Sequence, residues 1–94
     1  MAINVKFVGS FRGTSGKSKI SFRLKNSVSV RTLVAKTVDR LPRLKSSLTD
    51  PVSGGPRSNM LVLVNGQEIG VLNGLDTNIS DGDEVVFVPV VHGG

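Results

Sequence analysis

Residues 79–94 read ISDGDEVVFVPVVHGG, and this stretch sets our expectation for the whole fold. It begins with a short acidic turn around Gly82, because Asp and Gly favour the backbone conformations that reverse a chain. A run of mostly β-branched residues follows from Val85 to Val91 and predicts a buried strand. The stretch finishes with Gly93 and Gly94. Since neither residue has a Cβ, the carboxylate of Gly94 is unhindered, and we expect it to be the reactive group.

Two further strands are predicted near the start of the chain. Apolar and polar residues alternate over residues 3–7 and again over residues 20–24, which is the period of a half-buried strand. The intervening residues 9–16 are rich in glycine and serine. We therefore expect an irregular loop that joins the two strands into an antiparallel hairpin.

The apolar period changes to three and four residues after Ser29, which predicts one main helix. Ser29 suits the N-cap, and Pro42 should end the helix at Leu41. Leu44 and Leu48 continue the apolar stripe as a short further turn. The apolar face of the main helix consists of Val30, Leu33, Val34, Val38 and Leu41.

The second half of the chain predicts a loop, a second hairpin and a compact turn. Residues 49–59 have the composition of a loop. The continuous apolar run of residues 60–64 is followed by an Asn-Gly pair, a strong hairpin signal, and then by a brief return strand at residues 67–69. Residues 71–76 resemble a compact turn filled by two leucines.

This order of elements predicts an α+β protein with a mixed sheet of four to five strands and one main helix. A sheet that carries a single helix buries one face. The first and last strands can then lie side by side in parallel at the centre of the sheet, which is the β-grasp arrangement. We expect one domain over residues 1–94, with a flexible C-terminal diglycine tail at about residues 90–94.

The residue composition limits the chemistry of the chain. It has no cysteine and one histidine, which excludes a disulfide scaffold, an iron–sulfur cluster and a thiolate zinc site. Asp81, Asp83 and Glu84 are either turn-forming residues or cation ligands, and hard cations need six or more oxygens, so we expect no metal site. Since no segment has the pattern of a signal peptide or a membrane span, we expect a cytoplasmic protein without membrane contact.

Positive charge is confined to the first part of the chain. All twelve Lys and Arg residues lie at or before Arg57, whereas five of the seven acids lie at or after Glu68. The basic residues form either a face that is only solvated or a surface that attracts nucleic acids and acidic proteins. The alternative function is therefore a small basic nucleic-acid-binding or protein-interaction module. Because the chain has no Tyr or Trp to stack on bases, we do not expect direct nucleic-acid binding.

Strand parity predicts an apolar surface on the outer face of the sheet. If Phe87 faces the helix, Val86 and Val88 face away from it, and the same parity places Val8 and Leu63 outward. Scattered surface apolar residues need no explanation, but a contiguous group is a docking surface for a partner. We interpret these four residues as a partner-docking patch.

The acidic turn at residues 81–84, the strand that contains Phe87 and Pro89, and Gly93-Gly94 together resemble a known family. They resemble the ubiquitin-like β-grasp proteins of the MoaD/ThiS sulfur-carrier group. The chain is also similar to the ubiquitin-related modifier and to the small archaeal modifier proteins. The resemblance implies a sulfur carrier or protein modifier that is not itself an enzyme.

The resemblance also implies how the carboxylate is used. A free carboxylate is ionised and unreactive at neutral pH, so it has to be activated. In this family a ubiquitin-activating-type enzyme adenylates it, and that partner uses ATP and Mg²⁺, so we expect no permanently bound cofactor. Sulfur from a rhodanese or a desulfurase then gives a thiocarboxylate for tRNA thiolation or for molybdopterin synthesis with the large subunit of molybdopterin synthase. Alternatively, lysines of target proteins attack the activated carbonyl.

The residues next to the diglycine are then expected to be recognised by the partner. These tail residues are Val90, Val91 and His92. The unperturbed pKa of a histidine side chain is ~6.5, so His92 is either an acid–base helper at the carboxyl group or a recognition residue.

Overall fold

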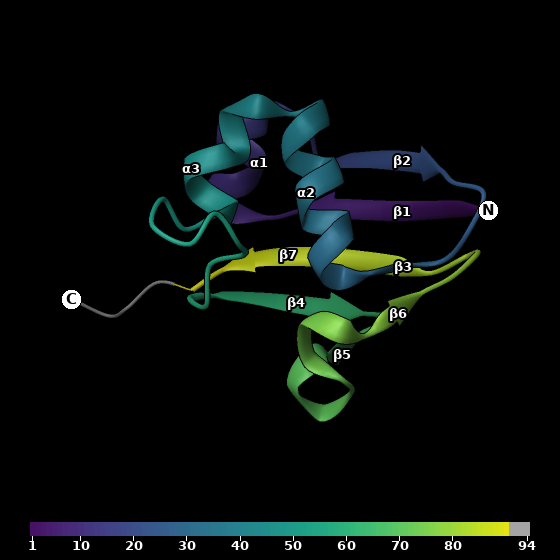
Figure 1. Ribbon diagram of the computed structural model, residues 1–94. Helices are drawn as coiled ribbons and strands as arrows, with labels where there is room; N and C mark the ends of the chain where they lie inside the picture. Colours follow the sequence, from purple (N-terminus) through teal and green to yellow (C-terminus); the bar gives the residue numbers. More distant parts are fainter. Residues whose placement is uncertain (91–94) are drawn as a thin grey trace.

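The computed structural model describes residues 1–90, which form a five-stranded sheet with helices packed against it (Figure 1). In spatial order the strands are β2 (Lys19–Arg23), β1 (Ala2–Phe7), β7 (Glu84–Pro89), β4 (Met60–Val64) and β5 (Gln67–Glu68). β1 is parallel to β7, whereas β1 with β2, β4 with β7 and β4 with β5 are antiparallel. The mixed sheet with parallel first and last strands is therefore confirmed.

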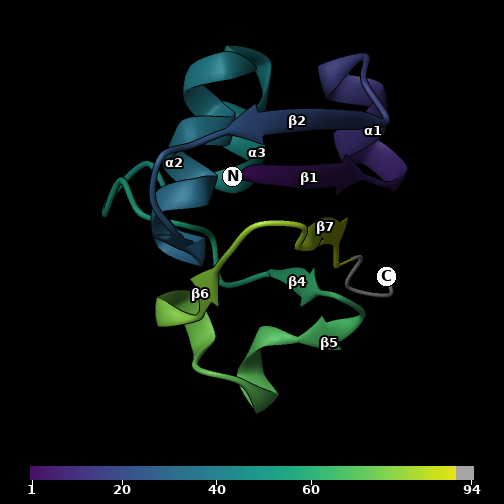
Figure 2. The ribbon, with the colours of Figure 1, turned by 90° about the vertical axis from the view of Figure 1, so that its right-hand side faces the viewer.

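The main helix, α2 (Val30–Arg40), lies on one side of β1 and β7 (Figure 2). The Ser29 hydroxyl accepts a hydrogen bond from the N–H of Thr32 at 3.1 Å, as expected for the N-cap. Val38 and Leu41 are only partly buried, although they pack against the core. Thr37, a polar residue of the same helix, is also buried. Its hydroxyl can be buried because it donates a hydrogen bond to the carbonyl of Leu33 at 2.8 Å.

The short turn predicted after the helix is confirmed. It consists of η1 (Pro42–Leu44) and α3 (Lys45–Leu48). Leu44 and Leu48 are fully buried, so this turn extends the apolar layer over the sheet.

The segment expected as a loop between the first two strands contains a helix, α1 (Gly9–Ser15), so that expectation is wrong. Phe11 in this helix is buried in the core, and burial of a large aromatic side chain offsets the poor helix propensity of the glycines. Gly16 ends the helix in the left-handed conformation, with φ 73° and its N–H bonded to the carbonyl of Arg12. The helix lies near the end of β1 where the chain leaves the sheet (Figures 1 and 2).

Residues 69–79 differ in part from the expected compact turn. They form η2 (Ile69–Val71), η3 (Gly74–Asp76) and β6 (Asn78–Ile79), and β6 pairs with β3 (Val28–Ser29) in a small second sheet. Leu75 packs against the core, but Leu72 is exposed, so one leucine fills the turn instead of two. Two-residue strands are too short to show an alternating pattern, and the second sheet was therefore not predicted.

The loop over residues 49–59 is held by Asp50. Its carboxylate accepts hydrogen bonds from the N–H groups of Val52 and Ser53 at 2.7 and 3.3 Å. These bonds stabilise the ionised form and hold the pKa of Asp50 below its ordinary value. Thr49 and Pro56 form an isolated bridge that closes the loop.

Phe87 lies at the centre of the core, and its replacement by alanine tests the fold. The Phe7 and Phe87 rings stack with centroids 6.2 Å apart. Phe87→Ala should lower the free energy of unfolding by ~3–5 kcal/mol, because it leaves a cavity between sheet and helix. Val52→Ala is the control, since Val52 is 94% exposed, and it should change the value by less than ~0.5 kcal/mol. Urea unfolding followed by circular dichroism measures both, and equal effects would contradict the assigned core.

Candidate functional site

The acidic turn fixes the start of β7 against the β4–β5 hairpin. The Asp83 carboxylate accepts hydrogen bonds from the N–H of Ser80 at 2.7 Å and from the side-chain amide of Asn65 at 3.0 Å. The amide oxygen of Asn65 accepts from the N–H of Glu84 at 2.9 Å. Gly82 in this turn has φ 82°, a conformation that favours glycine. The turn and the hairpin are therefore joined by side-chain hydrogen bonds.

The same turn is also joined to the start of β1. The Asp81 carboxylate accepts from the N–H of Ala2 at 2.7 Å, and the N–H of Gly82 donates to the carbonyl of Ala2 at 2.8 Å. The two aspartates thus act as turn acceptors for backbone and amide groups. Within residues 1–90, no group of three or more His, Asp or Glu side chains is arranged to hold a metal ion.

The sheet face turned away from α2 carries an apolar surface on β4 and β7. Val85 and Phe87 are buried, whereas Val86 and Val88 are half-buried, as the alternation predicts. Val86 lies opposite Leu63, and Val88 lies opposite Leu61. We call Leu61, Leu63, Val86 and Val88 the outer patch.

Leu61 is the residue of this surface that the sequence analysis missed. It is 41% exposed, more than Leu63 on the same strand. β4 is a continuous apolar run, so its composition does not show which residues face outward. The signal that could have found Leu61 is its position two residues before Leu63, because such residues share one face of a strand.

Val8 lies beyond the end of β1, as the residue that precedes α1, and it is 38% exposed. Phe7 is paired with Phe87, so Val8 follows at the end of the sheet where β7 also ends. The next residue, Gly9, packs so closely on Pro89 that a Cβ there would lie 3.1 Å from the proline ring. The chain exits of β1 and β7 are therefore adjacent.

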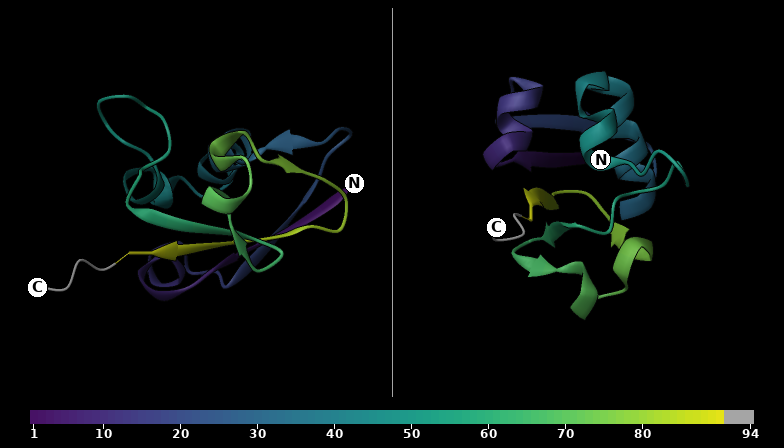
Figure 3. Two further views of the ribbon diagram at one scale, coloured as in Figure 1. Left: turned by 90° about the horizontal axis from the view of Figure 1, so that it is seen from below. Right: turned by 90° about the vertical axis from the view of Figure 1, so that its left-hand side faces the viewer.

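Polar residues border the outer patch on the β1 side. Lys6 is paired in register with Val86, and its ammonium group forms a 2.9 Å ion pair with the carboxylate of Glu84. The outward residues of β2 beyond it are Lys19, Ser21 and Arg23, all exposed. The apolar surface is consequently limited to β4 and β7, which lie side by side (Figure 3).

The chain leaves the sheet after Pro89, next to this patch. Val90, the first of the predicted tail-recognition residues, is exposed. The other predicted tail residues lie outside the described residues, so their roles stay predictions. They are Val91, His92, Gly93 and Gly94. Among residues 1–90, no helix is both long enough and apolar enough to cross a membrane.

Comparison with known proteins agrees with this fold. Ubiquitin-related modifier 1 of Schizosaccharomyces pombe is 35% identical over 99 residues, and small archaeal modifier protein 3 of Haloferax volcanii is 30% identical over 94 residues; each comparison covers 100% of both chains. The crystal structure of small archaeal modifier protein 1 from Haloferax volcanii has the same fold, with a TM-score of 0.87 at 21% identity over 100% of both chains.

These findings define the class of the protein as the ubiquitin-like β-grasp sulfur carriers and protein modifiers. The ThiS family matches residues 5–94, and the chain belongs to this family. The resemblance predicted from the acidic turn, the aromatic strand and the diglycine is confirmed.

Adjacent residues on β4 test the orientation of the outer patch. Leu61→Lys should change the free energy of unfolding by less than ~1 kcal/mol, because the new ammonium group stays in water. Val62→Lys is the matched control, since Val62 is 2% exposed and faces the core. It should unfold the protein or destabilise it by several kcal/mol, because it buries an unpaired charge. Thermal unfolding of both variants makes the comparison, and similar losses would contradict the outward position of Leu61.

Proposed function

We propose that this chain is a carrier whose Gly94 carboxylate is activated by a ubiquitin-activating-type enzyme, and that it has no catalytic groups of its own. The observation that supports the proposal is the position of the outer patch. Its Leu61–Val88 pair lies one residue before Pro89, from which the chain continues toward Gly93 and Gly94. A partner that binds the patch therefore has the tail beside its contact surface.

Activation requires chemistry that the partner supplies. A carboxylate oxygen of Gly94 attacks the α-phosphorus of ATP, and pyrophosphate leaves, so that an acyl-adenylate forms. Mg²⁺ and cationic side chains have to neutralise the phosphate charge during this step. In our proposal, ATP and Mg²⁺ bind to the adenylating enzyme, and this chain contributes the nucleophilic carboxylate.

The acyl-adenylate has two proposed fates. A persulfide from a rhodanese or a desulfurase displaces AMP, and reductive cleavage of the resulting acyl disulfide by a thiol gives the thiocarboxylate. That group donates sulfur in tRNA thiolation, or to a pterin precursor with the large subunit of molybdopterin synthase. In the second fate, the amine of a target lysine displaces AMP and forms an isopeptide bond. The names of two similar proteins, ubiquitin-related modifier 1 and small archaeal modifier protein 3, support the second fate.

The reach of the tail fits docking on the outer patch. Residues 91–94 span at most ~14 Å when extended, at ~3.3–3.6 Å per residue. An enzyme that holds the Gly94 carboxylate at its phosphate site must therefore also contact the body of the protein near Val90. Apolar residues at this end of the sheet include Leu61 and Val88 of the outer patch, Val8 and Val90, and apolar anchors suit the centre of an interface.

Removal of Gly94 tests the proposed reactive group. The Gly94-deleted protein should give no pyrophosphate exchange with ATP and the purified adenylating enzyme, because its carboxylate no longer reaches the α-phosphorus. The displacement of one residue, ~3.8 Å, far exceeds the ~1 Å misplacement that can cost a hundredfold in rate. Gly93→Phe should have the same effect if the passage admits no side chain.

A chain extended by one residue after Gly94 is a second test, and it should be inactive for the same geometric reason. The control measurement is thermal unfolding, in which all these variants should unfold at the temperature of the parent protein. Full activity of the Gly94-deleted form would contradict the carrier proposal and favour the basic interaction module instead.

A charged residue in the outer patch tests the docking surface. Leu63→Glu should weaken binding to the adenylating enzyme by more than ~1 kcal/mol, or about fivefold, because truncated or charged anchors are costly at the centre of an interface. Val52→Glu is the control with the same change in charge at a remote exposed position. Calorimetric titration measures both affinities. Equal affinities for the two variants would exclude the patch as the contact surface.

A further inference from the structure

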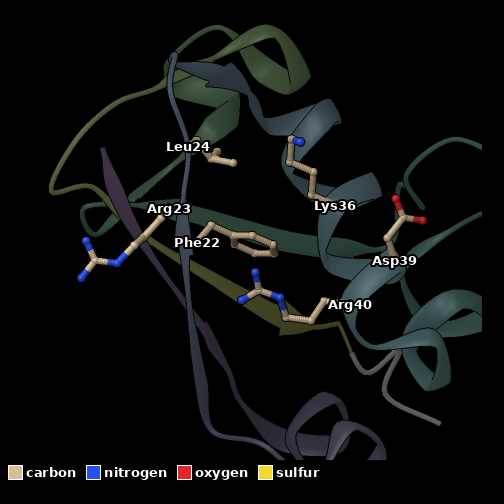
Figure 4. Close-up of a pocket in the computed structure, with 6 residues that line it drawn as sticks. All are labelled: Phe22, Arg23, Leu24, Lys36, Asp39 and Arg40. Carbon is tan, nitrogen blue, oxygen red and sulfur yellow. The ribbon is translucent and has the colours of Figure 1, made fainter.

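A second candidate binding surface lies between β2 and α2, at the edge of the sheet that is farther from β4. It is a groove of about 390 Å³ lined by residues from both elements (Figure 4). Phe22 and Leu24 point from β2 toward α2, whereas Arg23 points to the other side of the strand. The lining residues are Phe22, Arg23, Leu24, Lys36, Asp39 and Arg40.

The backbone of β2 is open on the side that faces this groove. β2 is the end strand of the sheet, and Met1 and Leu24 exchange two hydrogen bonds, of 2.9 and 3.0 Å, just beyond it. Because such pairs alternate along an antiparallel ladder, the N–H and C=O groups of Lys19, Ser21 and Arg23 point away from β1. The carbonyl of Ser21 accepts a 2.6 Å hydrogen bond from the Arg40 guanidinium, which agrees with this direction.

The groove combines an apolar floor with a basic border. The Arg40 guanidinium lies 4.2 Å from the centre of the Phe22 ring, and Leu24 packs beside it at the edge of the core. Lys36 borders the helix side, and the exposed Lys19 and Arg23 border the outer side of β2. Asp39 is the acid among the residues that line the groove.

We propose that this groove binds an extended acidic segment of a partner protein, which adds to β2 as a further strand. Its backbone bonds to the open groups of Lys19 and Arg23 and to the N–H of Ser21, whose carbonyl keeps its bond to Arg40. Side chains of an added strand alternate, so apolar residues lie on the helix side, beside Leu24 and the Phe22–Arg40 stack, and acidic residues lie on the other side, beside Lys19 and Arg23. The segment therefore alternates apolar and acidic residues.

A peptide fits these features better than a nucleic acid does. The Phe22 ring is 4% exposed and is covered by Arg40, so it has no free face on which a base can stack. A row of strand N–H and C=O groups matches a peptide backbone, which offers the same groups at the same spacing. The groove is also separate from the outer patch, because β1 lies between β2 and β7.

The test uses a short, blocked peptide in which valine and aspartate alternate, added to the full chain and followed by amide NMR shifts and hydrogen exchange. The amides of Lys19, Ser21 and Arg23 should shift and become protected, whereas those of Ile20 and Phe22, which already face β1, should change little. A peptide with proline at every second position should not bind, because it lacks the required N–H groups. Because both peptides are tested on the parent protein, this comparison does not depend on whether a substituted protein folds.

The matched variants are K19E/R23E and R12E/K45E, which change the net charge equally at exposed positions inside and outside the groove border. K19E/R23E should bind the peptide about tenfold more weakly, since it reverses the charges that face the aspartates, and R12E/K45E should bind nearly as the parent does. Both should keep the parent rate of pyrophosphate exchange, which separates this proposal from the carrier function. Equal loss in both variants, binding of the proline peptide, or tighter binding of oligouridine at the same amides would overturn the proposal.

Discussion

The core and the outer patch both depend on the register of β7, which the alternation of its residues specifies and the hydrogen bonds to Asp81 and Asp83 support. β7 lies between β1 and β4, and both neighbours are distant in sequence. Asp81 holds the turn to Ala2, and Asp83 holds it to Asn65 in the hairpin after β4. A shift of one residue would move Phe87 to the solvent side and bring Val86 into the core. The same two carboxylates thus support the register in which Val86 and Val88 face outward.

The elements that the sequence predicts well are those whose local pattern agrees with their burial. Buried and outward residues alternate along β7, and Ser29 is a clear N-cap of α2. α1 was missed because its glycines and serines indicate a loop, while the burial of Phe11, a tertiary effect, decides the structure. Leu61 was missed because β4 is apolar on both faces, so its composition does not show which residues face outward, and only its spacing from Leu63 could have indicated the exposed side.

The distribution of charge along the chain also has a spatial meaning in the fold. Three of the five late acids, Asp81, Asp83 and Glu84, lie in or beside the turn before β7, whereas early cations such as Lys19, Arg23 and Lys36 gather around β2 and α2. Between these regions, Lys6 and Glu84 form an ion pair beside the outer patch. The fold therefore separates a structural acidic turn, an apolar face and a basic edge.

The geometry of the carrier finally depends on where the chain leaves β7. Pro89 has no N–H to continue the ladder and fixes its own φ, so the strand ends there. Gly9 packs directly on the proline ring, and a Cβ at that position would lie 3.1 Å from the ring, so the ring would have to shift slightly to admit one. Val88 of the outer patch directly precedes Pro89 in β7, so the tail starts beside the patch. In the proposed function, the fold therefore supplies a defined starting point from which an enzyme can take up the tail.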